Sequence, residues 1–552
     1  MIHLRTRNIL GGVICLLFVG LLAFHTQYDG IRSYIPSQTS RKETANSQPT
    51  APLPSEYAHL LPGLRLPAQL EAYPLLHARL HAFLSRPVRS FDAARPLNEQ
   101  QCPRDLSDRL VNPDQLNGDG AFWREAVDEA VIRKKRVEMV EYLVQVLERG
   151  DDVVWNVERD AKIQQAEDLV DVNPDIARRA PVPLTSVQRG FVSAAGNSDT
   201  TQRLLTLLRI LRNRYHSTLP FQVWTFPGEL SPHSAEYREL TEELGATVHE
   251  TTGLAKDPGA WKNFQIKGLA ITSSSFRELV YLDSDNIPLR NPTKLFDSAR
   301  YLDRDAKAAF WPDLSKDHVD NAIWRIIGDE CTLDNWTFES GQIVIDKAGN
   351  SGLNLAALHL AAYMQADHDF WFSMCGGDKD TFRWAFRALD IPFATSPMWA
   401  VPLGQRNPFE GERFCGHTVL QYDLDVEPGE KEPRPMFVHS NLLKHISGVG
   451  RGHTFTHLKR MTNHSYSEPT LNYVHQWVYQ GVARGMCTDL EVWDSNPRLS
   501  EEEAEHQRVE LHALSDLPGQ PFDGFEDMFF DEGGRAGGWR RRKRRLAGAG
   551  LE

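Results

Sequence analysis

Short apolar runs alternate with stretches of helical periodicity in the middle of the chain. The apolar runs are Gly190–Ala195, Phe221–Thr225, Ala246–His249 and Glu278–Leu282. Helical spacing of apolar residues occupies the intervals at 204–211, 236–244 and 262–272. Strands that alternate with helices are typical of a parallel sheet covered on both faces. This part of the chain therefore predicts an α/β fold, a Rossmann-like and mostly parallel sheet flanked by helices.

The N-terminal part of the chain has a different pattern. Arg5 and Arg7 precede the apolar run Ile9–Phe24, and the residues from 26 to 60 are rich in Ser, Thr, Gln and Pro. A run of roughly 16 residues is short for the ~20 that cross a thick bilayer, but a thin membrane accepts it. The positive-inside rule then places everything after the run in the lumen. A cleaved signal peptide is the alternative, because the apolar length overlaps that of a signal h-region.

Two helical stretches precede the predicted sheet. Apolar residues recur at helical intervals from about 67 to 85 and again in Trp123–Glu148. We expect these helices to brace the part of the chain that holds the predicted sheet, with charges such as those of Arg133–Arg136 on a solvated face.

Charge and cysteine content narrow the set of partners. The formal net charge is -13, and such an acidic surface repels nucleic acid, so we expect no nucleic-acid partner. An anionic substrate must then be met locally, by a metal ion or a few Lys and Arg side chains. No CxxC pair occurs, which argues against a cysteine metal cage. The cysteines beyond the apolar run permit at most two disulfides, whose pairing the spacing does not reveal.

Two carboxylates follow the fourth apolar run directly, in the triplet Asp283-Ser284-Asp285. Strand ends are where open α/β sheets bind ligands. The alternation of an extended chain aims both aspartates to the same side, where they can bind a hard divalent cation. The triplet therefore predicts a metal site for a diphosphate-bearing donor.

Three other Asp-x-Asp triplets compete with this one, at 303–305, 378–380 and 423–425. The first lies in a charged stretch and the third leads into a polar loop, so both are better explained as solvated surface. Asp378 and Asp380 open the helical stretch Thr381–Leu389, where acidic residues also complement the helix dipole.

Several ordered motifs from about Arg189 to Lys444 resemble the fungal Golgi α-mannosyltransferases that build branches on the outer chain of N-linked mannan. The motifs are Arg189–Val192, Trp261–Lys267, Tyr281–Asn286, Phe310–Asp313, Glu339–Lys347, Gly377–Phe382 and Phe437–Lys444. The branch-initiating α-1,2 subgroup is the most similar. The resemblance implies a GT-A glycosyltransferase fold, GDP-mannose as donor, manganese (Mn²⁺) as metal, retention of the α configuration and a Golgi type II membrane topology.

The wider glycogenin-like transferases share the GT-A plan and also place a lysine in the helix before the Asp-x-Asp strand. Lys267 lies sixteen positions before Asp283, as in that plan. Those enzymes use a late histidine as third metal ligand in a His-Phe-x-Gly-x-x-Lys stretch, which His439 and Lys444 resemble. The glycine is missing here and the lysine comes one position early. Without the resemblance, a lone histidine after an apolar run is more often a satisfied core residue.

The resemblance also implies roles for the remaining candidates. The metal ligands are Asp283, Asp285 and His439, and the donor contacts are Arg189, Lys267, Asp283 and Lys444. Asp378 and Asp380 would lie by the acceptor, where a carboxylate orients the attacking hydroxyl or stabilises positive charge at the sugar ring. Glu339 and Gln342 flank Gly341, whose small size lets the backbone approach the sugar closely. The pattern does not decide which of these four groups faces the anomeric carbon.

We expect the chain to consist of six parts. They are a cytoplasmic tail (1–8), a transmembrane signal anchor (9–25), a flexible stem (26–66), a helical bracing region (67–180), a GT-A catalytic domain (181–495) and a disordered C-terminal extension (496–552) with a basic run at 540–545. The expected fold is thus a GT-A domain with an N-terminal transmembrane helix and a helical stem region.

The expected partners are GDP-mannose, a mannose-containing glycan acceptor, the membrane and other Golgi mannosyltransferases. The alternatives are a catalytically silent glycan-binding or scaffolding homologue, a UDP-sugar donor, or an α-1,3 linkage.

Overall fold

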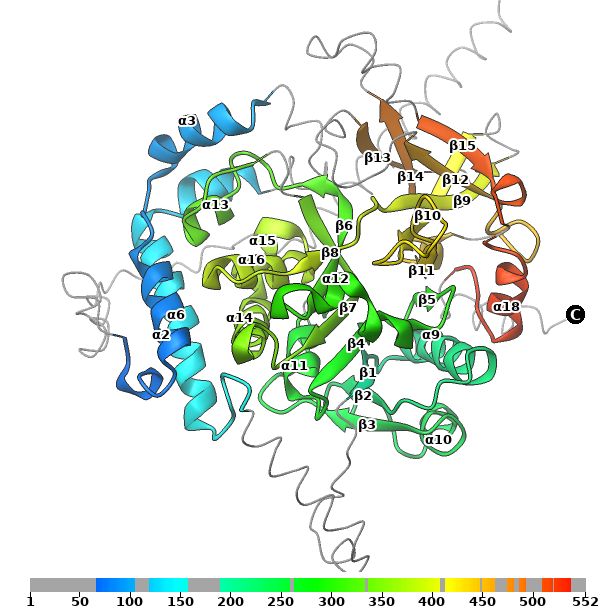
Figure 1. The fold of residues 1–552 in the computed structure, drawn as a ribbon, viewed down its shortest axis with the longest axis horizontal. Helices are drawn as coiled ribbons and strands as arrows, with labels where there is room; N and C mark the ends of the chain where they lie inside the picture. The colour runs from blue at the N-terminus through cyan, green and yellow to red at the C-terminus, as the bar shows by residue number, and fades with distance from the viewer. Residues whose placement is uncertain are drawn as a thin grey trace, which may run out of the picture. The chain divides into compact units, whose positions relative to one another are not determined.

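The computed structural model describes residues 66–104, 119–156, 189–258, 263–332, 336–407, 413–446, 449–461, 474–480, 486–492, 509–519 and 521–537 (Figure 1). The predicted tail, membrane anchor and stem, apart from residue 66, lie outside these ranges. Within them, no helix has both the length and the apolar character that a membrane crossing requires.

The larger sheet has seven strands in the order β3-β2-β1-β4-β7-β6-β8. Their bounds are β1 Arg189–Ala194, β2 Phe221–Thr225, β3 Ala246–Glu250, β4 Glu278–Leu282, β6 Ala308–Lys316, β7 Trp336–Asp346 and β8 Ala394–Thr395. All neighbours pair in parallel except that β7 is antiparallel to both β4 and β6. The mostly parallel α/β sheet predicted from the sequence is confirmed, including the four apolar runs, which form β1 to β4.

Helices cover both faces of this sheet. Figure 1 shows α11 (Ile266–Ser273), α14 (Leu353–Ala366) and α16 (Lys379–Leu389) on one side, and α9 (Ser198–Arg209) and α10 (Ala235–Arg238) on the other. Successive residues of β4 enter different cores, because strand side chains alternate between faces. Leu279 and Tyr281 belong to the core that contains α14 and α16. Val280 and Leu282 belong to the core that contains α9.

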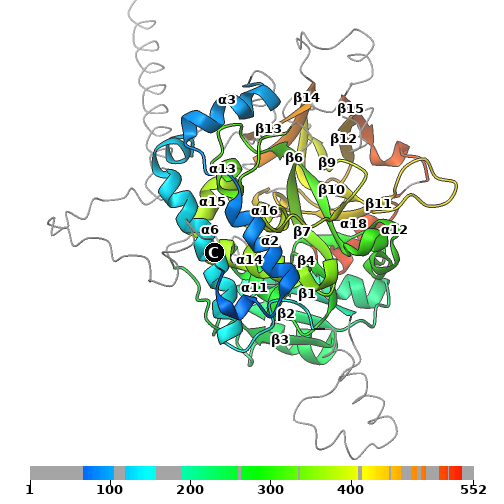
Figure 2. The same ribbon diagram turned by 60° about the vertical axis from the view of Figure 1, so that its left-hand side comes forward.

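The N-terminal helices α2 (Pro74–Ser85) and α6 (Glu129–Glu148) contribute to the first core together with α13 (Ile323–Ile327), α14, α15 (His368–Cys375) and α16 (Figure 2). A further helix, α3 (Phe91–Gln101), ends just before Cys102. The Cys102–Cys331 disulfide ties this region to the sheet-bearing part.

The prediction of a solvated charge run on α6 is wrong for Arg136. That side chain is 1% exposed and donates to four carbonyl oxygens, those of Arg86, Pro87, Arg325 and Ile326, which together satisfy the buried guanidinium.

A second, antiparallel sheet follows the first in sequence. Its strands are β9 Val401–Asn407, β10 Arg413–Tyr422, β12 His457–Met461, β13 Val474–Gln480, β14 Met486–Val492 and β15 Val509–Ala513, in the order β13-β14-β10-β9-β12-β15. The Cys415–Cys487 disulfide joins β10 to β14. Strand β11 (Pro435–His439) pairs with both β10 and the short strand β5 (Asn286–Pro288), which follows the Asp-x-Asp triplet.

The predicted disorder of the C-terminal extension is wrong for much of its length. β15 pairs with β12, and α18 (Phe525–Asp531) places Phe525 and Phe529 in the second core. The residues from 538 onward, which include the basic run, lie outside the described ranges.

Candidate metal and donor site

The Asp-x-Asp triplet lies at the carboxyl end of β4, where the chain turns into β5. Asp283 N donates to Gly341 O at 2.8 Å, and Asn286 N donates to Asp283 O at 3.0 Å. These bonds fix a tight turn that brings both carboxylates to one side of the strand end. The prediction that the two aspartates share a side is confirmed, because one oxygen of each belongs to a single cluster with His439.

His439 reaches the aspartates through strand pairing. β11 runs antiparallel to β5 with His439 opposite Asn286, and Ser440 N and Oγ both donate to Asp285 O, at 2.9 and 2.8 Å. His439 Nε2 consequently lies 3.2 Å from Asp285 Oδ1 and 3.9 Å from Asp283 Oδ2. One atom each of Asp283, Asp285 and His439 lies within 4.8 Å of the others.

This donor set fits a divalent ion of the Mn²⁺ type. Carboxylate oxygens suit hard cations, and an imidazole nitrogen suits first-row transition metals. Burial opposes charge on His439, but Glu339 and Asp285 together raise its pKa to about 10. Burial also opposes charge on Asp285, yet Lys444 and His439 hold its pKa well below the usual range. Without a metal the ring therefore carries a proton between Asp285 and Glu339, and a bound ion would take the place of the proton on Nε2. The geometry holds two carboxylate oxygens and one ring nitrogen within reach of one ion.

Glu339 holds the imidazole from its other side. Glu339 Oε1 lies 3.1 Å from His439 Nδ1 and also accepts from Gly341 N at 2.8 Å. Although burial raises the pKa of this carboxyl, His439 lowers it to about 2. A carboxylate that binds the far nitrogen of a metal-ligating histidine fixes the ring orientation and its basicity. Glu339 therefore contacts the metal-ligating residue His439, and we expect it to position the His439 ring.

Gly341 makes this arrangement possible. A Cβ at position 341 would lie 2.6 Å from His439 Nδ1, closer than real side chains approach one another. The small residue was predicted to admit the sugar, but the group that approaches its backbone here is the His439 ring.

Two lysines border the carboxylates. Lys267, from the first turn of α11, places Nζ 3.0 Å from Asp283 Oδ2 and 2.8 Å from Asp378 Oδ2. Although burial disfavours its charge, the two carboxylates raise its pKa. Lys444 Nζ lies 2.8 Å from Asp285 Oδ2. The site thus holds two ammonium groups beside the carboxylates, as a diphosphate requires.

Gln342 and Asn286 form an amide pair at the same strand end. Asn286 Nδ2 donates to Gln342 Oε1 at 2.6 Å and to Gly341 O at 2.7 Å. Gln342 Nε2 and Asn286 Oδ1 are buried and have no hydrogen-bond partner among the described residues. Buried polar atoms without partners are uncommon in proteins, so this donor and this acceptor are open to a ligand.

Asp378 joins the cluster and Asp380 does not. Asp378 Oδ2 accepts from Ser340 Oγ at 3.1 Å and contacts Lys267. Asp380 is fully buried and pairs with Arg383 at 3.0 Å, and its Oδ1 accepts from Phe338 N at 3.0 Å. Arg383 also pairs with the buried Asp317. Asp380 is therefore occupied inside a charged core network, and the prediction of a role at the acceptor is not supported for it.

The predicted donor contact Arg189 lies at the wrong end of the sheet. It pairs with Glu278 at the start of β4 and reaches Asp297 Oδ1 at 3.6 Å. Five residues of strand separate Glu278 from Asp283, or roughly 16 Å at 3.3 Å per residue. The Arg189–Val192 motif forms the start of β1, where its arginine pairs with the buried Glu278 and the exposed Asp297.

Sequence reasoning missed two groups that hold the site. Tyr281 OH donates to Asp283 Oδ1 at 2.9 Å, and Ser340 Oγ accepts from Lys267 Nζ at 2.9 Å. The signal for Tyr281 was its place two residues before Asp283, which aims both side chains to one side of the strand. Ser340 belongs to the Glu339–Lys347 motif, but a single serine at this position did not indicate a contact with Lys267.

Comparison with protein families gives an independent view of this region. Residues 188–336 and 330–423 match the family model described as "Mannosyltransferase putative". The chain is 28% identical over 290 residues to Alpha-1,2-mannosyltransferase MNN22 of Candida albicans, covering 43% of this chain and 47% of that relative. It is 22% identical over 363 residues to Alpha-1,2-mannosyltransferase MNN5 of Saccharomyces cerevisiae, covering 54% and 59%. The chain thus spans less than two thirds of the length of these relatives.

Solved structures that overlap with part of the chain include the glycosyltransferase GlyE of Streptococcus pneumoniae, with 14% identity, a TM-score of 0.25, and coverage of 38% of this chain and 45% of that one. A second is the galactosyltransferase LgtC in complex with donor and acceptor sugar analogues, with 12% identity, a TM-score of 0.25, and coverage of 38% and 73%.

Proposed function

Because the chain belongs to the family of the fungal α-1,2-mannosyltransferases, a glycosyltransferase family, we propose that it transfers mannose from GDP-mannose to an α-linked mannose acceptor on glycoproteins. We further propose a GT-A fold, an α-1,2 linkage, retention of the anomeric configuration and dependence on Mn²⁺. The observation that carries the proposal is the cluster of Asp283, Asp285 and His439 at a strand end, bordered by the ammonium groups of Lys267 and Lys444.

Each residue of the cluster has a task in this reaction. Asp283, Asp285 and His439 would hold the metal ion, which supplies Lewis-acid neutralisation of the departing diphosphate. Lys444 lies at Asp285 and provides a further positive charge for the same leaving group. Lys267 and Tyr281 hold the carboxylate of Asp283, and Glu339 holds the ring of His439. The ligands are thereby fixed in orientation before the donor arrives.

The sugar side of the site offers amides and one carboxylate. The side-chain amide nitrogen of Gln342 (Nε2) and the side-chain oxygen of Asn286 (Oδ1) have no partner among the described residues. We propose that they bind sugar hydroxyls. Asp378 can stabilise positive charge at the sugar ring. In a retaining reaction within one site, an oxygen of the leaving phosphate accepts the proton of the acceptor hydroxyl, so no separate general base is required.

We also propose that the protein acts in the Golgi lumen as a single-pass type II membrane protein, in the assembly of cell-wall mannan. The support is the family relationship and the pattern of Arg5 and Arg7 before the apolar run Ile9–Phe24.

The test is a donor screen with the purified full-length chain. GDP-mannose and UDP-sugars are each supplied with Mn²⁺ and an α-mannoside acceptor, and the release of nucleoside diphosphate is measured. We expect release from GDP-mannose only, and an α-1,2 linkage by nuclear magnetic resonance of the product. Release from a UDP-sugar alone would overturn the donor assignment. Absence of any turnover, with binding to mannan retained, would identify a silent homologue.

A further inference from the structure

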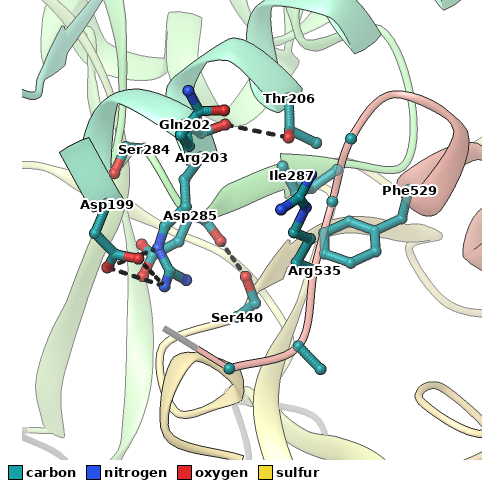
Figure 3. A pocket seen from close by; sticks show the side chains of 14 residues that line it. Asp199, Gln202, Arg203, Thr206, Ser284, Asp285, Ile287, Ser440, Phe529 and Arg535 are labelled. Atoms are coloured by element: carbon teal, nitrogen blue, oxygen red, sulfur yellow. Dashed lines mark hydrogen bonds and ion pairs between the residues drawn. The ribbon is translucent and has the colours of Figure 1, made fainter. Parts of the chain in front are cut away.

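The segment that follows α18 returns to the metal cluster. It comprises residues 532–537, which we call the C-terminal strap. Figure 3 shows the strap running from Phe529 past Arg535 toward Ser440. Ser440 directly follows the ligand His439. A segment nearly one hundred residues further along the chain thus lies beside the turn that leaves the metal cluster.

The end of the strap contacts the backbone that carries Lys444. Gly537 N donates to Leu443 O at 2.9 Å. Leu443 is buried and begins the short 3₁₀ helix Leu443–His445. Lys444 extends from the middle of this helix and places Nζ 2.8 Å from Asp285 Oδ2. The strap therefore holds the backbone from which Lys444 reaches the cluster.

The start of the strap is anchored on the helices of the larger sheet. Glu532 is buried, and its carboxylate accepts from Arg214 Nε at 2.7 Å and from Asn213 Nδ2 at 3.1 Å. Its backbone oxygen accepts from Arg209 Nη1 at 3.0 Å. These donors belong to the end of α9 and to the π-helix Ile210–Arg214 that continues it. The strap thus connects α9 to the Lys444 turn.

Two glycines fix the course of the strap between these ends. Gly533 has φ +96°, and a Cβ there would lie 2.6 Å from Arg209 Nη1. Gly537 has φ +81°, and a Cβ there would lie 3.0 Å from Ile446 O. Glycine adopts such backbone angles without steric cost. Both ends of the strap are therefore in close contact with the segments that they join.

Helix α18 supports the same turn by a second route. Glu526 accepts from Phe455 N at 3.4 Å, and the Phe455 ring lies 5.4 Å from the ring of Phe529. On its other side the Phe455 ring lies 5.7 Å from the ring of His417. His417 O accepts from Leu442 N at 3.1 Å. The turn is thus held from both sides by the C-terminal part of the chain.

From these contacts, and resting on the function proposed above, we propose that the C-terminal strap positions Lys444 for the departing diphosphate, with Glu532 as the residue that anchors it. The ammonium group of a lysine is a point charge on a flexible four-carbon stem, so its place depends on how firmly its backbone is held. A displacement of about 1 Å at a reacting group can cost on the order of 100-fold in rate. Glu532 is a positioning residue that acts through Lys444.

Hydrogen exchange of the full-length protein, followed by mass spectrometry, tests the contact without need of turnover. Glu532→Ala removes the acceptor for Arg214 and Asn213. We expect the amides of residues 439–446 to exchange roughly ten-fold faster than in the wild-type protein, because a charged anchor is lost. The amides of β4 should exchange at the wild-type rate.

Arg451→Ala is the matched control. Arg451 pairs with Asp527 and Asp531 on α18, so its loss removes ion pairs from the same helix and leaves the contacts of Glu532 in place. We expect residues 439–446 of this variant to exchange at the wild-type rate.

A double-mutant cycle tests whether Glu532 acts through Lys444. Glu532→Ala should lower kcat/KM for GDP-mannose roughly ten-fold, and by less than about two-fold in a Lys444→Ala background, because residues that act through one another are not additive. The Kd of Mn²⁺ should stay at the wild-type value. Any decrease in melting temperature should be the same in both backgrounds, which separates stability from positioning.

A second variant covers the case in which Glu532→Ala does not fold. Gly537→Ala strains the backbone beside Ile446 O and leaves Glu532 intact. It should give the same faster exchange at 439–446 and the same dependence on Lys444.

The outcomes separate this inference from the proposed function. Wild-type exchange at 439–446 in both variants would overturn the strap, as would equal losses of kcat/KM in the wild-type and Lys444→Ala backgrounds, and the function would stand. If the wild-type protein transfers no mannose, the proposed function falls. The exchange rates then decide alone: faster exchange supports the strap as a holder of the Lys444 turn, and unchanged exchange overturns it.

Discussion

Glu339 and His439 come from different sheets and meet at 3.1 Å, Oε1 to Nδ1, with the opposite ring nitrogen turned to Asp285. The contact requires β7 to carry Glu339 past the end of β4, and β11 to pair with β5. The metal ligand is therefore oriented by a carboxylate from the larger sheet.

Glu339→Gln should weaken Mn²⁺ binding while the fold survives. Glutamine retains an oxygen that can accept from Gly341 N, but it removes the negative charge that fixes the His439 ring. Loss of such an outer partner costs roughly 10–100-fold in metal affinity. The measurement is a Mn²⁺ titration followed by electron paramagnetic resonance, with the circular-dichroism spectrum as a check on folding. If Mn²⁺ affinity stays at the wild-type value while transfer is abolished, Glu339 acts on the sugar instead of positioning His439.

Asp380→Asn should reduce stability. The substitution leaves the buried Arg383 with one carboxylate instead of two, and breaking a buried ion pair costs on the order of 3 kcal/mol. Thermal melting is the measurement, with the exposed Asp516→Asn as control. An unchanged melting point together with loss of transfer would instead restore Asp380 to the acceptor site.

Acid should destabilise the protein through His417. Burial lowers the pKa of this residue to about 4, although its hydrogen bond to Thr454 O at 2.9 Å opposes the shift. The unfolded chain binds this proton near pH 6.5, and the folded chain binds it only near pH 4. Between these values protonation favours the unfolded chain, so the free energy of unfolding is highest above about pH 6.5 and decreases as the pH falls toward 4. The loss from one such histidine is at most roughly 3 kcal/mol.

Denaturant unfolding at pH 7 and pH 4.5 measures this loss. His417→Gln, which retains a donor for Thr454 O, should lose less stability on acidification than the wild-type protein. His233→Gln is the control, because His233 is exposed. Equal losses in the wild-type protein and His417→Gln would contradict the assignment.

The sequence predicted the central sheet well because its strands are buried on both faces and read as continuous apolar runs. It also predicted the metal cluster, since Asp283 and Asp285 follow a strand directly and the resemblance supplied His439. The second sheet was missed because its strands come from dispersed segments such as β12 and β15, whose pairing no local pattern reveals. The contacts of Glu339, Asp380 and Arg189 could not be predicted for the same reason. Each role depends on which side chain a distant strand or helix brings opposite.

The C-terminal segment was underestimated because its composition is rich in glycine and acidic residues. Such composition is typical of disorder when no partner surface exists. Here Glu532 meets Arg214 and Asn213, and Phe529 enters the second core. A local reading of the sequence could not include those long-range contacts.

The central claim is that one divalent ion binds at Asp283, Asp285 and His439 and that transfer depends on it. The most direct test is to titrate Mn²⁺ into the full-length wild-type protein and into Asp285→Asn, and to measure bound Mn²⁺, GDP release from GDP-mannose and the melting point on the same samples. The account predicts one Mn²⁺ site in the wild-type protein, loss of both that site and turnover in Asp285→Asn, and a melting point changed by only a few degrees. Retention of Mn²⁺ binding and turnover by Asp285→Asn would contradict it.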